Sequence, residues 1–330
     1  MPNHPRPLSA KDCTAMFEVS PMVTKRRLLI LGILMLSIWA PAARAADGEA
    51  PESFASPEQA VEALITAARA DDATALLRIY GPAGEPLISS GDPVADKGAR
   101  ARFVQHYGEG SKIERDTAGK ATLVIGPEEW PFPIPIMQQA GSWHFDVAAG
   151  TEEILDRRVG RNELNAIEVC RSYVEAQRDY AADLQGEGKP AEYAQKFVSS
   201  AGHHDGLYWP AGSGEKASPI GPQMASARAE GYGGAGDQPG RPEPYHGYFY
   251  KILTRQGVSA PGGARDYLDD GGMTRGFALL AFPAKYGDSG VKTFIIDQDG
   301  IVFEKDLGPD TSTVAPAITE FDPDLSWKTP

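Results

Sequence analysis

The stretch between residues 151 and 184 has apolar side chains three or four positions apart, which is the period of a helix buried along one face. Its apolar stripe consists of Leu164, Ile167, Cys170, Val174 and Ala181. An apolar stripe of this length must be buried against another element of the fold. Four segments rich in β-branched and aromatic residues follow it, at 248–254, 277–282, 292–297 and 301–307. We therefore predict a long helix packed on an antiparallel sheet of about four strands.

Shorter elements precede the long helix. Ser56-Pro57-Glu58-Gln59 matches the capping box that begins a helix, and Gly141-Ser142 separates two alternating segments as in a hairpin. The 130–135 segment is rich in proline, so we expect it at an edge and not in the middle of a sheet. The sequence therefore predicts an α+β fold. An N-terminal helical and small-sheet domain would cover 46–150, and a C-terminal domain would cover 151–330.

A Gly/Pro-rich excursion at 199–245 interrupts the C-terminal domain. It still carries the large aromatic residues Tyr208, Trp209, Tyr232 and Tyr245, which a flexible linker rarely contains. We therefore expect an ordered excursion that lies on the surface of this domain.

The segment at residues 1–45 has the pattern of an export signal with an upstream extension. Basic residues at 25–27 precede an apolar run at 28–39, and Ala43-Arg44-Ala45 fits the small-x-small cleavage pattern. The apolar run is shorter than the roughly 18–20 residues of a membrane-spanning helix, which is the alternative interpretation. We predict a signal peptide at about 22–45, cleavage between Ala45 and Ala46, and a periplasmic or secreted protein with no stable membrane anchor.

Charge and cysteine content exclude several classes of partner and site. The chain has 32 Lys and Arg against 45 Asp and Glu, a net charge of −13, and loss of the basic segment at 1–45 makes it more acidic. Such a chain repels phosphate backbones, so nucleic acid is not an expected partner. Of the two cysteines, Cys13 precedes the cleavage site. Cys170 is then left without a disulfide partner, and we expect it to be a small core residue and not a reactive thiol.

Three motifs resemble catalytic or binding sequences without their required context. Gly287-Asp288-Ser289-Gly290 matches the serine block of trypsin-like proteases, but no matching histidine block lies upstream, so we predict a turn. The G-x-G-x-x-G spacing at 231–236 is followed by prolines and not by a helix. Asp297-Gln298-Asp299-Gly300 lies between strand segments, which favours a hairpin over a calcium loop. The sequence thus predicts no catalytic residue and no cofactor.

Two groups of residues remain as weak candidates for a site. His203, Asp205 and His246 are the best metal-ligand candidates, although adjacent histidines at 203 and 204 point to opposite sides of an extended chain. Exposed aromatic side chains form the second group, which would stack on glycans or peptides. Its members are Tyr208, Trp209, Tyr245 and Tyr248. The alternative is that these rings hold the excursion against the sheet.

Several blocks resemble those of one family of exported bacterial proteins, the domain of unknown function 2950 group. The blocks lie at 130–135, 160–164, 205–210, 245–248, 260–264 and 286–291. This resemblance covers nearly all of the chain after the signal and implies export and a shared fold, but no reaction. The region from 162 to 180 also resembles the soluble helix of type IV pilin-like proteins, whose leader and membrane-spanning helix are missing here.

The functional hypothesis is an exported, non-catalytic binding or accessory protein whose partner is an unknown component of the cell envelope. A periplasmic hydrolase is the alternative. It would use the region of His203, Asp205 and His246, with or without a bound metal ion. A pilin-like accessory protein is a third interpretation.

Overall fold

The computed structural model describes residues 50–188, 190–210, 216–233 and 243–330. The predicted signal peptide and its Ala45–Ala46 cleavage site lie outside these ranges. So do 211–215 and 234–242 of the predicted excursion, which include part of the 231–236 glycine motif. Residues 48–330 form one compact unit with an α+β fold, which confirms the predicted fold class. Across the described ranges, no helix combines the length and apolar character needed to cross a bilayer.

The first described elements are short helices, and serine or aspartate side chains cap α1, α2 and α4 among them. They are α1 (Pro57–Arg69), α2 (Ala73–Tyr80), the 3₁₀ turn η1 (Pro82–Gly84), α3 (Glu85–Ile88) and α4 (Pro93–Glu109). The predicted Ser56 cap is confirmed, because Ser56 Oγ accepts from Gln59 N at 3.3 Å. The reciprocal bond of the predicted capping box is shifted by one residue, since Gln59 Oε1 accepts from Ala55 N at 3.3 Å. Asp72 and Asp92 cap α2 and α4 as Ser56 caps α1.

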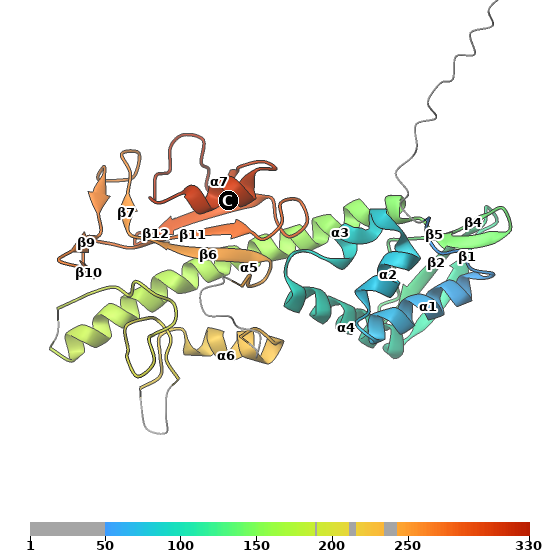
Figure 1. The fold of residues 1–330 in the computed structure, drawn as a ribbon, viewed down its shortest axis with the longest axis horizontal. Helices are drawn as coiled ribbons and strands as arrows, with labels where there is room; N and C mark the ends of the chain where they lie inside the picture. Colours follow the sequence, from blue (N-terminus) through green and yellow to red (C-terminus); the bar gives the residue numbers. More distant parts are fainter. Residues whose placement is uncertain (1–49, 189, 211–215, 234–242) are drawn as a thin grey trace, which may run out of the picture. The chain divides into compact units, whose positions relative to one another are not determined.

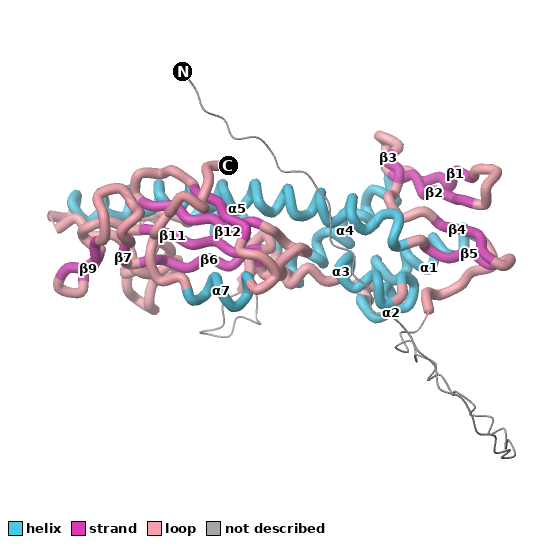
Figure 2. The backbone as a smooth tube through the Cα atoms, turned by 90° about the horizontal axis from the view of Figure 1, so that it is seen from above, coloured by secondary structure: helices cyan, strands magenta, loops and turns pink. Residues whose placement is uncertain are grey.

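An antiparallel sheet follows these helices. Its strands are β1 (Ser111–Arg115), β2 (Lys120–Ile125), β3 (Trp130–Pro131), β4 (Ile136–Gln139) and β5 (Ser142–Phe145). The order is β1-β2-β4-β5, and the proline-rich β3 pairs only with β2, at an edge as predicted. The predicted hairpin is confirmed, since β4 pairs with β5 and Ile136 lies opposite Phe145. Figure 2 shows α1 beside β5, where the smaller hydrophobic core lies.

The long helix α5 runs from Val147 to Gly186 and begins at the Asp146 cap. It crosses the proline-rich segment so closely that a Cβ on Gly150 would lie 2.5 Å from the Pro133 carbonyl oxygen. Its buried positions include Ala166, Cys170, Val174 and Ala181. Burial raises the pKa of the Cys170 thiol to about 12, which leaves it unreactive at neutral pH.

One residue of the predicted stripe on α5 was wrongly assigned. Leu164 is 70% exposed. It lies two positions from both Asn162 and Ala166, which are buried, and two positions on a helix are a rotation of about 200°. The buried face before Cys170 is therefore marked by asparagine and alanine, not by leucine.

The second sheet packs on α5. It contains β6 (Tyr248–Leu253), β11 (Ala278–Pro283), β12 (Lys292–Asp297) and β13 (Phe303–Asp306), in the order β13-β12-β11-β6 and entirely antiparallel. Helix α5 covers one face, and α7 (Thr311–Ala317) packs against β11 on the other (Figure 1). The predicted long helix on a four-stranded antiparallel sheet is confirmed. The larger hydrophobic core fills the space between them.

Small elements that the sequence did not predict complete the fold. The connection from β6 to β11 forms the two-residue strands β7 (Arg255–Gln256), β8 (Arg265–Asp266), β9 (Leu268–Asp269) and β10 (Gly272–Met273). Helix α6 (Gly221–Glu230) lies within the excursion. It ends at Gly231, whose φ of 104° is a left-handed conformation suited to glycine.

The β12–β13 turn contains a buried carboxyl group. Asp297 is 3% exposed, and its Oδ1 accepts from Asp299 N at 3.1 Å. Burial raises its pKa from the ordinary value to about 6, because the charged form loses solvation. The folded state therefore holds this proton to higher pH than the unfolded chain. The group's contribution to stability is full below about pH 4 and falls as pH rises through 6.

We expect Asp297→Asn to raise the free energy of unfolding at pH 7.5 by about 1–3 kcal/mol, because the amide keeps the turn hydrogen bond without a buried charge. At pH 4 the gain should vanish. Urea unfolding at the two pH values measures this. Asp299→Asn is the matched control, since Asp299 is exposed in the same turn and should show a much smaller gain. An equal gain for Asp297→Asn at both pH values would contradict the buried-charge explanation.

Candidate ligand-binding site

The four aromatic side chains singled out in the sequence do not share one exposed surface. Tyr208 is buried with the Arg228 guanidinium 4.9 Å from its ring centre, and Trp209 is buried with its ring stacked on His204 at 4.2 Å. Tyr248 is fully buried and donates to the Lys292 carbonyl at 2.9 Å. Tyr245 is half-buried. Three of the four therefore pack inside the protein, where they contribute to the core.

The weak metal-ligand candidates are also engaged elsewhere. The Asp205 carboxylate accepts from Lys196 Nζ at 2.5 Å and from Ser200 N at 2.7 Å, which lowers its pKa well below the ordinary value. His246 lies 3.5 Å from a Glu230 oxygen, and burial lowers its pKa. In the part of the chain that the structure describes, no three His, Cys, Asp or Glu side chains are grouped to hold a metal ion. His203, Asp205 and His246 are thus not brought together.

The Gly287–Gly290 motif forms a turn, as predicted. Ser289 is fully buried, and its hydroxyl donates to the Lys285 carbonyl at 3.1 Å and accepts from Lys285 N at 2.9 Å. Asn162 Nδ2 donates to the Ser289 carbonyl at 2.9 Å, and Glu163 Oε1 accepts from the backbone N–H groups of residues 291 and 292. These polar blocks therefore fasten α5 to the loop before β12, and Ser289 is not placed as a nucleophile.

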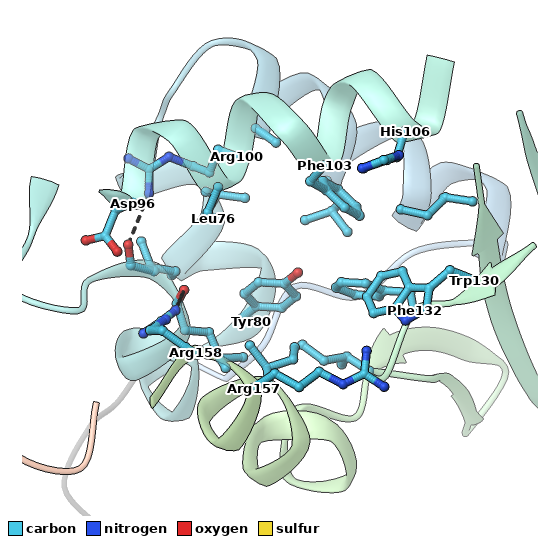
Figure 3. A pocket seen from close by; sticks show the side chains of 18 of the residues that line it. Leu76, Tyr80, Asp96, Arg100, Phe103, His106, Trp130, Phe132, Arg157 and Arg158 are labelled. Carbon is cyan, nitrogen blue, oxygen red and sulfur yellow. Dashed lines mark hydrogen bonds between the residues drawn. The ribbon is translucent and has the colours of Figure 1, made fainter. Parts of the chain in front are cut away.

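A different part of the molecule contains a cavity of about 400 Å³, bounded by α4, α5 and the N-terminal sheet (Figure 3). Its lining on α4 has helical spacing and consists of Asp96, Ala99, Arg100, Phe103 and His106. Its lining on α5 repeats that spacing with Ile154, Arg157, Arg158 and Arg161. Residues three, four and seven positions apart share a helix face, so each helix presents one mixed apolar and basic face to the cavity.

Helix α4 is packed less tightly than its neighbours. The only buried residue on it is Asp96, whereas α1 buries seven residues. Phe103 is half-buried, with its ring centre 5.2 Å from that of Phe132 across the cavity wall. The space beneath α4 is therefore not filled by described side chains, and it is open to solvent, since Ala99, His106 and Arg161 in its lining are exposed.

Tyr80 is the most informative residue in the cavity. It is 6% exposed, and its ring packs edge-on against Phe145 at 5.4 Å. Figure 3 shows its hydroxyl directed into the cavity between α4 and α5. Within the described ranges no protein group forms a hydrogen bond with this hydroxyl, and burial raises its pKa. The hydroxyl oxygen is not enclosed and stays open to the cavity, where an oxygen of water or of a ligand can accept a hydrogen bond from it.

One end of the cavity is closed by satisfied polar groups. Arg158 donates to the carbonyls of Pro86 and Leu87 at 2.7 and 2.8 Å. Arg100 donates to the Ile88 carbonyl at 3.1 Å and to Asp71 at 2.6 Å. Nearby, the buried Asp96 carboxylate accepts from Ser90 N at 3.0 Å. These bonds hold α3 between α4 and α5.

The other arginines are less fully occupied. Arg157 pairs with Glu153 at 2.5 Å, and its guanidinium lies 5.5 Å from the Trp130 ring centre. Arg161 is exposed at the rim of the cavity and forms no hydrogen bond or ion pair with any described residue. Its pKa is lowered, first by burial and then by the charge of Arg102. The Arg157–Arg161 side of the cavity therefore has more positive than negative charge.

The sequence contains one signal for this cavity, on a single face of α5. The residues at 154, 157, 158 and 161 share one face of α5, where an isoleucine stands among three arginines. A helix face that mixes arginine with apolar residues is typical of a site for an anion, or of a solvated face. Tyr80 offered no signal, because its place at the end of a short helix does not reveal what its hydroxyl contacts.

Comparison with known proteins defines the family but adds no activity. The sequence model of the family described as "Protein of unknown function (DUF2950)" matches residues 51–329. No curated protein and no solved structure matches the chain. The family match spans both hydrophobic cores, the cavity and all the blocks that carried the resemblance. The chain therefore belongs to the DUF2950 family.

Proposed function

We propose that the protein is an exported, non-catalytic binding protein that holds a small molecule of the cell envelope, apolar over most of its surface, in the cavity beneath α4. The observation that carries this proposal is the Tyr80 hydroxyl, which opens into the cavity and has no protein partner in the described chain. A ligand oxygen would satisfy this hydroxyl.

The shape and lining of the cavity support binding. Small-molecule pockets have volumes of roughly 300–1,000 Å³ and are mostly apolar with a few polar groups, and the cavity fits both criteria. A bound molecule would also supply the packing that α4 lacks. The basic and apolar signal at 25–39, followed by Ala43-Arg44-Ala45, supports export to the compartment where envelope components are found.

A cavity-filling variant tests the proposal. Ala99 and Ala101 are both exposed residues of α4, but Ala99 lines the cavity and Ala101 does not. We expect Ala99→Trp to bind the neutral fluorescent probe N-phenyl-1-naphthylamine at least ~10-fold more weakly than the unchanged protein, because the indole occupies the site. Ala101→Trp should bind the probe normally.

Protein for this test is taken from the periplasmic fraction of cells that express the full chain. Its intact mass should correspond to a start at Ala46. Absence of probe binding by the unchanged protein, or equal binding by Ala99→Trp, would contradict the binding function. A mass that includes residues 28–39 would contradict export with cleavage.

A further inference from the structure

We propose that the ligand is a single-tailed amphiphile with an anionic head group, and that Arg161, with Arg157 beside it, binds this head. This inference rests on the proposed binding function and adds the chemical class of the ligand. It follows from the difference between the arginines of the cavity lining that have protein acceptors and the one that has none.

Charge favours the Arg161 end for an anion. Four arginines line the cavity, and three have acceptors: Arg158 uses backbone carbonyls, Arg100 uses a carbonyl and Asp71, and Arg157 uses Glu153. Arg161 is left with its full donor capacity among the described residues. A carboxylate or phosphate accepts from guanidinium in a bidentate, charge-assisted geometry, so either group fits this place.

The walls favour an apolar tail. Side chains that face the cavity between its charged ends include Leu76, Phe103, Phe132 and Ile154. Burying a hydrocarbon chain against them is worth about 0.8 kcal/mol per methylene in water-to-apolar transfer, which an isolated inorganic anion would not gain. The Tyr80 hydroxyl lies among these walls and gives an oxygen of the ligand one more hydrogen-bond donor (Figure 3).

Volume limits the size of the tail. At about 30 Å³ for each water-sized or methylene group, 400 Å³ accommodates roughly 13 such groups of a flexible chain. Fused aromatic rings need less volume per atom, so the planar probe also fits. A ten-carbon carboxylate has nearly this size. A two-tailed phospholipid would leave most of its hydrocarbon outside the cavity. The ligand therefore has a single hydrocarbon tail of medium length.

The test measures displacement of N-phenyl-1-naphthylamine by decanoate, decyl phosphate and decanol. With the unchanged protein, both anions should displace the probe at concentrations at least ~10-fold lower than decanol. Arg161→Gln should remove this preference while leaving displacement by decanol unchanged. Arg171→Gln is the control, because Arg171 is exposed on the same helix and does not line the cavity.

Each outcome supports or overturns the assignment. If only decanoate or only decyl phosphate shows the preference, the anionic class stands and the source is a free fatty acid or a phosphate-bearing molecule, respectively. If decanol displaces the probe as well as both anions do, or if Arg161→Gln keeps the preference, the head-group assignment is wrong. Probe binding that is lost in Ala99→Trp would then still support the cavity function. Failure of the unchanged protein to bind the probe would overturn both proposals.

Discussion

Replacing Asp92 by alanine is expected to lower the free energy of unfolding by about 3–5 kcal/mol, because one buried carboxylate serves three donors. Its Oδ1 accepts from Ala95 N at 3.0 Å and caps α4. Its Oδ2 accepts from the Tyr232 hydroxyl at 2.9 Å and from Gly247 N at 2.8 Å. The variant loses the cap and leaves two buried donors without an acceptor.

Urea unfolding measures this loss, and Asp72→Ala is a matched control. Asp72 also caps a helix, accepting from Ala75 N at 2.9 Å, but it is exposed and its side chain forms no other hydrogen bond with the described residues. Asp72→Ala should lower the free energy of unfolding by only about 1 kcal/mol. Hydrogen exchange should also rise over α6 in Asp92→Ala, since Tyr232 follows that helix. A loss no greater than that of Asp72→Ala would show that Asp92 acts as a cap alone.

Replacing Gly290 by alanine is expected to cost about 3 kcal/mol or more, because the added methyl has no space. A Cβ at this position would lie 2.1 Å from the Tyr248 hydroxyl oxygen and 2.6 Å from Cζ of the same ring. Tyr248 cannot move aside easily, because it is fully buried and its hydroxyl donates to the Lys292 carbonyl. The clash therefore has to be relieved by movement of the loop before β12.

A second variant isolates the cause. Tyr248→Phe removes the closest clashing atom, so the cost of Gly290→Ala should fall by about 1–2 kcal/mol in that background. Gly160→Ala is the control, because nothing lies near its would-be Cβ in the middle of α5. It should raise the free energy of unfolding by about 0.5–1 kcal/mol through helix propensity. Equal costs for Gly290→Ala with and without the Tyr248 hydroxyl would rule out the steric explanation.

Much of the fold could be predicted because periodicity and local turn chemistry determine it. The cap at Ser56, the hairpin at Gly141 and the strands on either side of Asp299 depend on a few neighbouring residues. The excursion could not be predicted in the same way. Its path depends on distant groups, such as Asp92, which lies 140 residues before Tyr232. Leu164 was placed wrongly for a related reason, since periodicity alone does not show that Asn162 takes the buried position.

The cavity was harder to predict than the fold. The sequence offers aromatic and histidine residues as site candidates. In the structure, Trp209 and Tyr248 are buried in the core, and among the described residues His203 and His246 belong to no group of metal ligands. The cavity instead arises from what is missing beneath α4, and a sequence does not state where packing is incomplete. Tyr80 illustrates this limit, because the same residue with a protein acceptor would be an ordinary core tyrosine.

Helix α5 lines the cavity with residues 154–161 and fills the larger core with residues from 166 onward. A gene fusion that exchanged either half for foreign sequence would have to cut through this helix or strip one of its faces of neighbours. We therefore expect the two parts of the DUF2950 fold to occur together in one protein, and either part to occur only rarely as a separate domain fused to another protein.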